Sequence, residues 1–185
     1  MAESSPRPRE WLQSSEKERQ LLFLQASMAP DIFLGDFRGI DTLVQQLQRY
    51  GTYFDNMSHE QEHMVQKSDQ LVVLSVVLNV TISEATLQQV FPRLKLTGQA
   101  QGRGRFLRSR MLGQQLFLPC SFCFEWDEIS NCVVRMGTSV DFLSPIVELL
   151  GVEDASIVLN HALIASDSAI GDFSEQSASN AIATY

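Results

Sequence analysis

The stretch "DQLVVLSVVLNVTIS", residues 69–83, decides the fold. Its apolar side chains recur at every second position in an unbroken row, made of Val72, Leu74, Val76, Leu78, Val80 and Ile82. A two-residue period places them all on one face of a β-strand, whereas a helix needs a period of about 3.6 residues. A turn near Ser68 and Asp69 separates this strand from the polar stretch before it. We therefore predict a hairpin of strands over 58–66 and 70–82.

Two further strands follow the hairpin. Alternating apolar residues run through 111–126 and 129–142, and Asp127 with Glu128 supplies the polar turn between them. Gly137 interrupts the second of these strands and predicts a bulge or a sharp bend there. Together with the hairpin, the pair predicts a curved antiparallel sheet.

The residues before the sheet favour helices. A first helix is predicted over 16–28 and ends before Pro30. A second is predicted over 40–54, where apolar side chains recur at helical spacing: Ile40, Leu43, Val44, Leu47 and Phe54. Helices followed by long antiparallel strands indicate an α+β fold, in which the helices pack on one side of a strongly curved antiparallel sheet.

One folded domain is predicted between two tails. Residues 1–15 are polar and contain prolines, and residues 166–185 form an acidic stretch rich in Ser and Ala, so both are predicted to be disordered. No repeat or interior linker divides residues 16–165, which are predicted to form a single domain. At 185 residues, the chain is long enough to bury a sizeable core.

The charge of the chain limits its partners. A formal net charge of −8 and a pI of about 4.8 give no general attraction to nucleic acid or to an anionic membrane surface. The N-terminus lacks the apolar core of a secretory signal, and the longest apolar run, 71–82, is too short to span a bilayer. We expect an intracellular protein, cytoplasmic or nuclear, with no membrane partner.

Three cysteines bear on metal and redox chemistry. Cys120 and Cys123 form a CxxC pair, but no second pair and no well-spaced histidines complete the ligands that a structural zinc site needs. The flanking sequence "LFLPCSFCFEW" is typical of a strand and not of the helix start in a thioredoxin-type site. We expect free thiols, no metal and no cofactor.

The order of helix, short strand, helix, hairpin and long strand pair resembles the nuclear-transport-factor-two-like cone. That superfamily includes the SnoaL-like polyketide cyclases and the ketosteroid isomerases. The resemblance covers about residues 16–150 and lies in "LFLQASMAPDIFLGD", "GIDTLVQQLQRYGTYF", "SHEQEHMVQKSDQLVVLSVVLNV" and "SNCVVRMGTSVDF". It implies a cystatin-like cone whose interior takes a small apolar ligand.

A narrower resemblance is carried by "FLQASMAPDIFLGDFRGIDTLVQQLQRYGTYF", "QVFPRL", "GQQLFLPCSFCFEWD", "SVDFLSPIVELLG" and the later "ALIA". These stretches resemble the region downstream of the basic zipper in oomycete bZIP-type transcription factors. In those proteins a cone-like domain follows the DNA-binding helix. No basic region and no leucine heptads precede residue 16 here. The resemblance therefore implies the companion domain alone, and DNA binding is not carried over.

Asp31 and His59 are the candidate catalytic residues, and the resemblance implies them. In cyclase-like and dehydratase-like cones, an aspartate after the first helix orients a histidine that opens the first long hairpin strand and abstracts a proton from carbon. Asp31 and His59 fall on these positions, although His63 stands where an asparagine is usual. A structural interpretation competes and is favoured: Asp31 braces the end of the first helix, and His59, among acidic residues, is a surface histidine.

Two further residues are candidate ligand contacts. Asp141 lies near the end of the last strand, and Phe54 lies at the end of the second helix. A carboxylate on the inward side of the last strand would face the cone interior, but the inward pair could equally be Val140 and Phe142. A structural or surface role is the stronger alternative for Asp141.

A basic stretch from Arg93 to Arg110 is the remaining candidate site. It holds six of the fourteen Lys and Arg residues and no acidic residue. The last four arginines of the stretch are the candidates for contact with phosphate or with a partner: Arg103, Arg105, Arg108 and Arg110. Because no recognised nucleic-acid motif accompanies them, nucleic acid is a weaker candidate than an acidic protein partner or self-association.

Two classes of function stay open. The first is a non-catalytic ligand-sensing or dimerisation module associated with transcriptional regulators; the alternative is a cofactor-free isomerase, cyclase or dehydratase that uses Asp31 and His59. The sheet carries more apolar surface than a small monomer usually exposes, with Leu116, Leu118, Phe122 and Trp126 on one side and Phe117 on the other. We therefore expect a homodimer through the outer face of the sheet.

Overall fold

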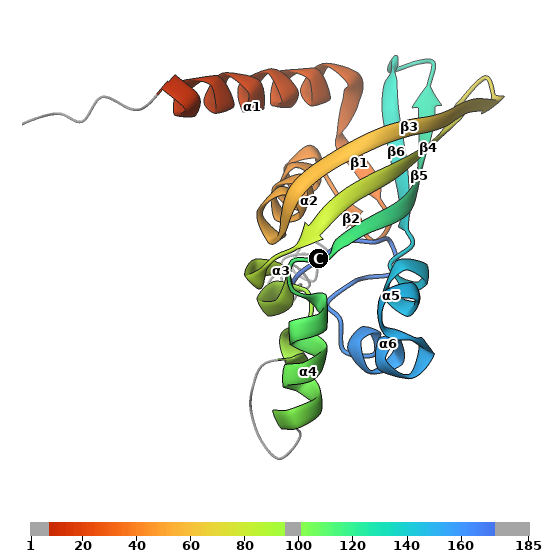
Figure 1. Cartoon of the computed structure of the whole chain (residues 1–185). Helices are drawn as coiled ribbons and strands as arrows, with labels where there is room; N and C mark the ends of the chain where they lie inside the picture. The colour runs from red at the N-terminus through yellow and green to blue at the C-terminus, as the bar shows by residue number, and fades with distance from the viewer. Residues whose placement is uncertain (1–7, 95–100, 173–185) are drawn as a thin grey trace, which may run out of the picture.

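The computed structural model describes residues 8–94 and 101–172 (Figure 1). In chain order, its elements are α1 (Pro8–Ser27), β1 (Met28–Leu34), β2 (Phe37–Arg38), α2 (Ile40–Tyr53), β3 (Phe54–Ser68), β4 (Leu71–Ile82), α3 (Glu84–Gln89), the 3-10 turn η1 (Pro92–Leu94), α4 (Gln101–Met111), β5 (Gln115–Asp127), β6 (Cys132–Val140), α5 (Leu143–Leu150) and α6 (Val152–Leu159). Two helices precede the long strands, so the predicted α+β class is confirmed.

The sheet has six strands in the order β2-β1-β6-β5-β4-β3. β3, β4, β5 and β6 are antiparallel neighbours, which confirms the predicted hairpin and strand pair. β1, whose pairing the sequence did not predict, pairs with β6 in the parallel sense, so the complete sheet is mixed. This pairing satisfies backbone N–H and C=O groups along the edge that β6 would otherwise leave open.

Alternate residues of the central strands build the inner face of the sheet. Leu78 of β4 lies opposite Leu118 of β5, and Val80 lies opposite Leu116. Val80 and Leu118 are fully buried, and Leu116 nearly so. The row of apolar side chains that the two-residue period predicted on β4 therefore faces the core, as expected for a strand with one buried face.

The core has two parts on this inner face. The main cluster joins β4 and β5 to α3, α4, α5 and α6, whose short helices gather at one end of the sheet (Figure 1). The smaller cluster joins α1, α2 and β1 to the far part of the sheet through Ile32, Leu43 and Met136. α1 reaches away from the body at the other side (Figure 1).

Both ends of the domain differ from the predicted boundaries. α1 begins at Pro8, earlier than the predicted start at residue 16. At the other end, residues 166–172 belong to the folded part, because Ile170 is fully buried in the main core. The remainder of the two predicted tails, 1–7 and 173–185, lies outside the described residues.

Candidate functional site

The structure does not bring Asp31 and His59 together. Asp31 lies on β1 and His59 on β3, and three strands separate these two in the sheet. Ile32 is fully buried on the inner face, so its neighbour Asp31 points to the opposite face. His59 lies opposite Leu78, on the inner side. Both side chains are exposed, and no hydrogen bond or ion pair between them occurs in the described part of the chain.

Asp141 and Phe54, the two candidate ligand contacts, both interact with neighbouring residues of the same chain. The backbone N–H of Ser144 donates to Asp141 Oδ1 at 2.9 Å, so the carboxylate satisfies a free backbone donor in the first turn of α5. The hydrogen bonds from Ser144 hold the pKa of this carboxyl below its usual value. Phe54 is only 2% exposed, and its ring stacks between those of Tyr50 and Phe142 at centroid distances of 6.0 and 6.3 Å. Its contacts are with the core.

The last four arginines of the basic stretch lie on the helix α4, whereas Arg93 lies in η1 and Lys95 is outside the described residues. Three of the arginines on α4 bind acceptors within the fold. Arg103 pairs with Asp154 at 2.6 Å, in the first turn of α6. Arg110 donates to the carbonyl oxygen of Leu149, at the end of α5, at 2.5 Å. Asp154 lies near the N-terminus of α6, where the helix dipole favours a negative charge. The Leu149 carbonyl oxygen lies near the C-terminus of α5, where the dipole favours the positive charge of Arg110. Arg105 is exposed.

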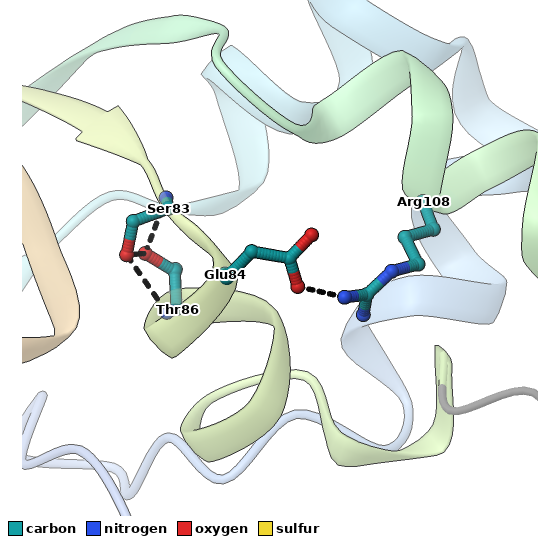
Figure 2. A network of polar contacts seen from close by, with 4 residues as sticks. All are labelled: Ser83, Glu84, Thr86 and Arg108. Carbon is teal, nitrogen blue, oxygen red and sulfur yellow. Dashed lines mark hydrogen bonds and ion pairs between the residues drawn. The ribbon is translucent and has the colours of Figure 1, made fainter.

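Arg108 makes the corresponding contact to α3. Its guanidinium pairs with Glu84, the first residue of α3 (Figure 2). The same helix begins with a capping box, in which the Ser83 hydroxyl accepts from the Thr86 N–H at 3.2 Å and the Thr86 hydroxyl accepts from the Ser83 N–H at 2.9 Å (Figure 2). Ser83 also donates to the carbonyl oxygen of Tyr53, which ties α3 to the end of α2. The arginines of α4 thus link this helix to α3, α5 and α6.

Sequence reasoning missed the segment that closes the chain. Residues 163–171, which we name the C-terminal strap, follow α6 and pack against α2, with Ile170 inside the main core. The Ser- and Ala-rich composition predicted disorder from residue 166. The available signal was Ile164 just before that stretch and Ile170 within it, which together form an isolated β-bridge.

The outer face of the sheet is built from the other residues of the same strands. We define it by Val73, Ser75, Val77, Phe117, Pro119, Ser121, Cys123, Gly137 and Ser139. Side by side across β4, β5 and β6 lie Ser75, Ser121 and Ser139, and the next row holds Val73, Cys123 and Gly137.

The predicted dimer surface needs one correction. Leu116 and Leu118 were counted among the apolar residues in excess of what a monomer buries, but both are buried in the main core of the same chain. Phe117 is 59% exposed, and Val77 and Cys123 are half-buried. The apolar surface left uncovered on this face therefore consists of small side chains and the exposed Phe117.

Two negative findings concern other kinds of site. Across residues 8–94 and 101–172, no three His, Cys, Asp or Glu side chains gather as a metal ion would require. Within the same described ranges, no helix has both the length and the apolar character needed to cross a membrane.

The fold is that of the nuclear-transport-factor-two-like and SnoaL-like cones. A SnoaL-like polyketide cyclase from Agrobacterium tumefaciens superimposes with a TM-score of 0.51 at 12% identity, over 75% of this chain and 91% of that one. TsrD from Streptomyces laurentii gives 0.49 at 13% identity, over 80% and 100%. An NTF2-like protein from Burkholderia thailandensis gives 0.47 at 14%, over 74% and 90%. The cyclase likeness shows the fold alone.

A narrower similarity concerns the N-terminal part. The family model described as the BZIP transcription factor 1 C-terminal domain matches residues 2–53. The match ends with the last residue of α2, so its described portion comprises α1, β1, β2 and α2. It agrees with the resemblance to bZIP-associated domains. No curated protein matches the sequence.

Proposed function

We propose that this chain is a non-catalytic cone that self-associates through its outer sheet face and serves transcriptional regulators as a companion module. The main observation behind this proposal is the outer face of the sheet. The helices that contribute to either core cluster do so on the inner face, while Phe117 projects from the outer one. A second copy would bury the rows of Ser, Val, Cys and Gly side chains against equivalent rows, as in sheet-on-sheet packing.

A non-catalytic role is supported by the separation of the acid–base candidates. An aspartate can orient a histidine only within hydrogen-bond reach, and Asp31 and His59 lie on different strands and opposite faces of the sheet. Phe54, Phe142 and Ile170 fill the inner side with the protein's own apolar groups. This arrangement favours the module over the cyclase-like alternative.

The regulatory association is supported by the family-model match over residues 2–53. Charge argues that the partner is a protein and not DNA. Arg103, Arg108 and Arg110 are engaged by acceptors of neighbouring helices, and the chain as a whole is acidic.

Sedimentation equilibrium tests the proposed self-association. We expect a concentration-dependent dimer of the 20.8 kDa chain. Val77→Arg should raise its dissociation constant at least tenfold, about 1.4 kcal/mol, because two like charges would meet near the centre of the interface. Phe106→Arg is the matched control, since Phe106 is 53% exposed but lies on α4. A monomer at about 100 µM, or equal effects of the two variants, would contradict the proposal.

A further inference from the structure

One stripe of α2 holds the C-terminal strap. Gln46, Arg49, Tyr50 and Tyr53 recur three and four residues apart, so they lie on the same side of the helix. Tyr50 Oη donates to the carbonyl oxygen of Ser168 at 2.6 Å, and Arg49 Nη1 donates to that of Ile170 at 3.0 Å. Gln46 Oε1 accepts from the Ile170 N–H at 3.0 Å. Side chains of α2 therefore bind the main chain of the strap.

The strap is a compact loop whose ends meet. The Gly171 N–H donates to the carbonyl oxygen of Leu163 at 2.9 Å, and the Ser168 N–H donates to that of Ala165 at 2.9 Å. The Val140 N–H of the sheet donates to Ser168 Oγ at 2.8 Å, and the Leu163 N–H donates to the carbonyl oxygen of Val90 at the end of α3 at 2.8 Å. The Ile170 side chain packs in the main core. The strap joins no extended strand ladder, so it can separate from the sheet without breaking one.

Its conformation depends on close contact with α2 and the β1–β2 turn. Ser168 has a φ of 62°, which is uncommon for a residue other than glycine. At Gly171, where φ is 99°, an added Cβ would lie 3.2 Å from Arg49 Nη1 and 3.2 Å from Tyr53 Cε2. At Gly35, an added Cβ would lie 2.6 Å from Asp167 Oδ2. The strap therefore lies so close to α2 and to the β1–β2 turn that a side chain larger than glycine at residue 35 or 171 would strain the contact.

Beneath the strap lies a group of donors beside apolar side chains. Burial raises the pKa of the Tyr50 hydroxyl far above its ordinary value, so this group stays a donor at neutral pH. Gln46 Nε2 is buried and has no hydrogen-bond partner among the described residues. Phe54 and Phe142 line the apolar side. A buried unpaired donor is costly, and an acceptor oxygen would satisfy it.

We propose that the C-terminal strap is a gate that opens as a unit while the sheet stays folded, and that the uncovered α2 donors bind an apolar carboxylate. The ligand's oxygens would replace the carbonyl oxygens of Ser168 and Ile170, and its alkyl part would replace the Ile170 side chain. Arg49 favours a carboxylate over a neutral acceptor. The inference goes beyond self-association and does not depend on it, because a monomer would show the same opening.

Native-state hydrogen exchange on the full chain tests the gate. The amides of Ser168, Ile170 and Gly171 should exchange at least tenfold faster than the ladder amides of β4 and β5, and with a smaller dependence on denaturant. The proposal would be overturned if the strap amides exchanged only on global unfolding, at the same rate and with the same denaturant dependence as the ladder amides.

A pair of glycine variants sharpens this result. Gly171→Ala should speed exchange of the strap amides a further tenfold and leave the β4–β5 ladder within about threefold. Gly113→Ala is the matched control: its φ of 76° imposes similar backbone strain, but nothing lies within 4 Å of the added Cβ. It should leave the ratio of strap to ladder rates unchanged. Equal effects on the ratio would count against the gate, and if Gly171→Ala fails to fold, the wild-type rates decide.

Decanoate is the probe for the ligand. At concentrations where the ladder amides are unaffected, it should raise the exchange rates of the strap amides at least threefold, because it displaces the strap. Decylamine, which has the same chain length and the opposite charge, should not do so. No change with decanoate, or an equal change with both compounds, would overturn the carboxylate assignment.

Discussion

The inner and outer faces of β5 are made from alternate residues of one strand, and they have opposite roles. Leu116, Leu118 and Cys120 are buried by helices of the same chain. Phe117 and Pro119, between them, are exposed. The difference teaches that the two-residue period of one strand encodes two surfaces, of which one packs in the core and the other faces away from it.

The largest expected effect is the contrast between two neighbouring residues. Leu118→Ala should lower the free energy of unfolding by about 2–5 kcal/mol, because it opens a cavity at a fully buried position. Phe117→Ala should change it by less than about 0.5 kcal/mol under conditions where the protein is a monomer. Urea denaturation of both variants measures the contrast, and similar losses would show that the outer face is also part of the core.

The Cys120 thiol on the inner face makes the stability of the fold depend on pH. Burial raises the pKa of the Cys120 thiol to about 11, whereas an ordinary thiol titrates near 9.0. Between these values the unfolded chain binds fewer protons than the folded one, so stability is complete below pH 9 and falls as the pH rises. The loss should reach about 1 kcal/mol by pH 10.

Denaturation curves from pH 8 to pH 10 measure this loss in wild type and in two variants. Cys120→Ala should remove this part of the slope, whatever it does to stability at pH 8. Cys123→Ala, on the outer face, should keep the wild-type slope. Loss of the slope in Cys123→Ala, or an unaltered slope in both variants, would contradict the assignment of this pH dependence to the Cys120 thiol.

The sequence predicted an element correctly where its pattern is local, and missed it where the element depends on contacts with distant residues. The row from Val72 to Ile82 predicted β4 and its buried face correctly, because strand periodicity is a local property. α4 could not be predicted in the same way. Gly102 and Gly104 disfavour a helix, and its stability comes from Leu107 and Met111 in the core and from arginines paired with acids of distant helices.

The candidate site was harder to predict for a related reason. Asp31 and His59 each occupy the expected place along the chain, but the face that each side chain takes depends on pairing with other strands. The C-terminal strap escaped prediction because its anchors, Gln46 and Tyr50, lie more than a hundred residues earlier. Composition alone does not reveal such a contact.

A smaller effect separates two substitutions of Asp141. Asp141→Ala should lower the free energy of unfolding by about 1 kcal/mol, because the Ser144 N–H in the first turn of α5 loses its acceptor. Asp141→Asn should retain most of it, since asparagine caps helices well. Thermal denaturation of the pair at pH 7 measures the cap, and a large loss with asparagine would indicate a role for the charge beyond capping.

The smallest effects are expected at the separated candidate pair. Asp31→Asn and His59→Gln should each change the free energy of unfolding by less than about 0.5 kcal/mol, since both side chains are exposed. Their effects should add in the double variant. A coupling energy above about 1 kcal/mol from this double-mutant cycle would show that the two side chains interact after all.

The reactivity of the native Cys123 thiol tests most directly whether a second copy covers the outer face. Cys123 lies in that face, whereas Cys132 begins β6 outside the rows that define it. Maleimide labelling of wild-type protein should slow at Cys123 as the concentration rises through the dissociation constant, because the dimer buries it. The rate at Cys132 should stay constant and serve as the internal reference. A Cys123 rate that is independent of protein concentration while the protein dimerises would contradict the account.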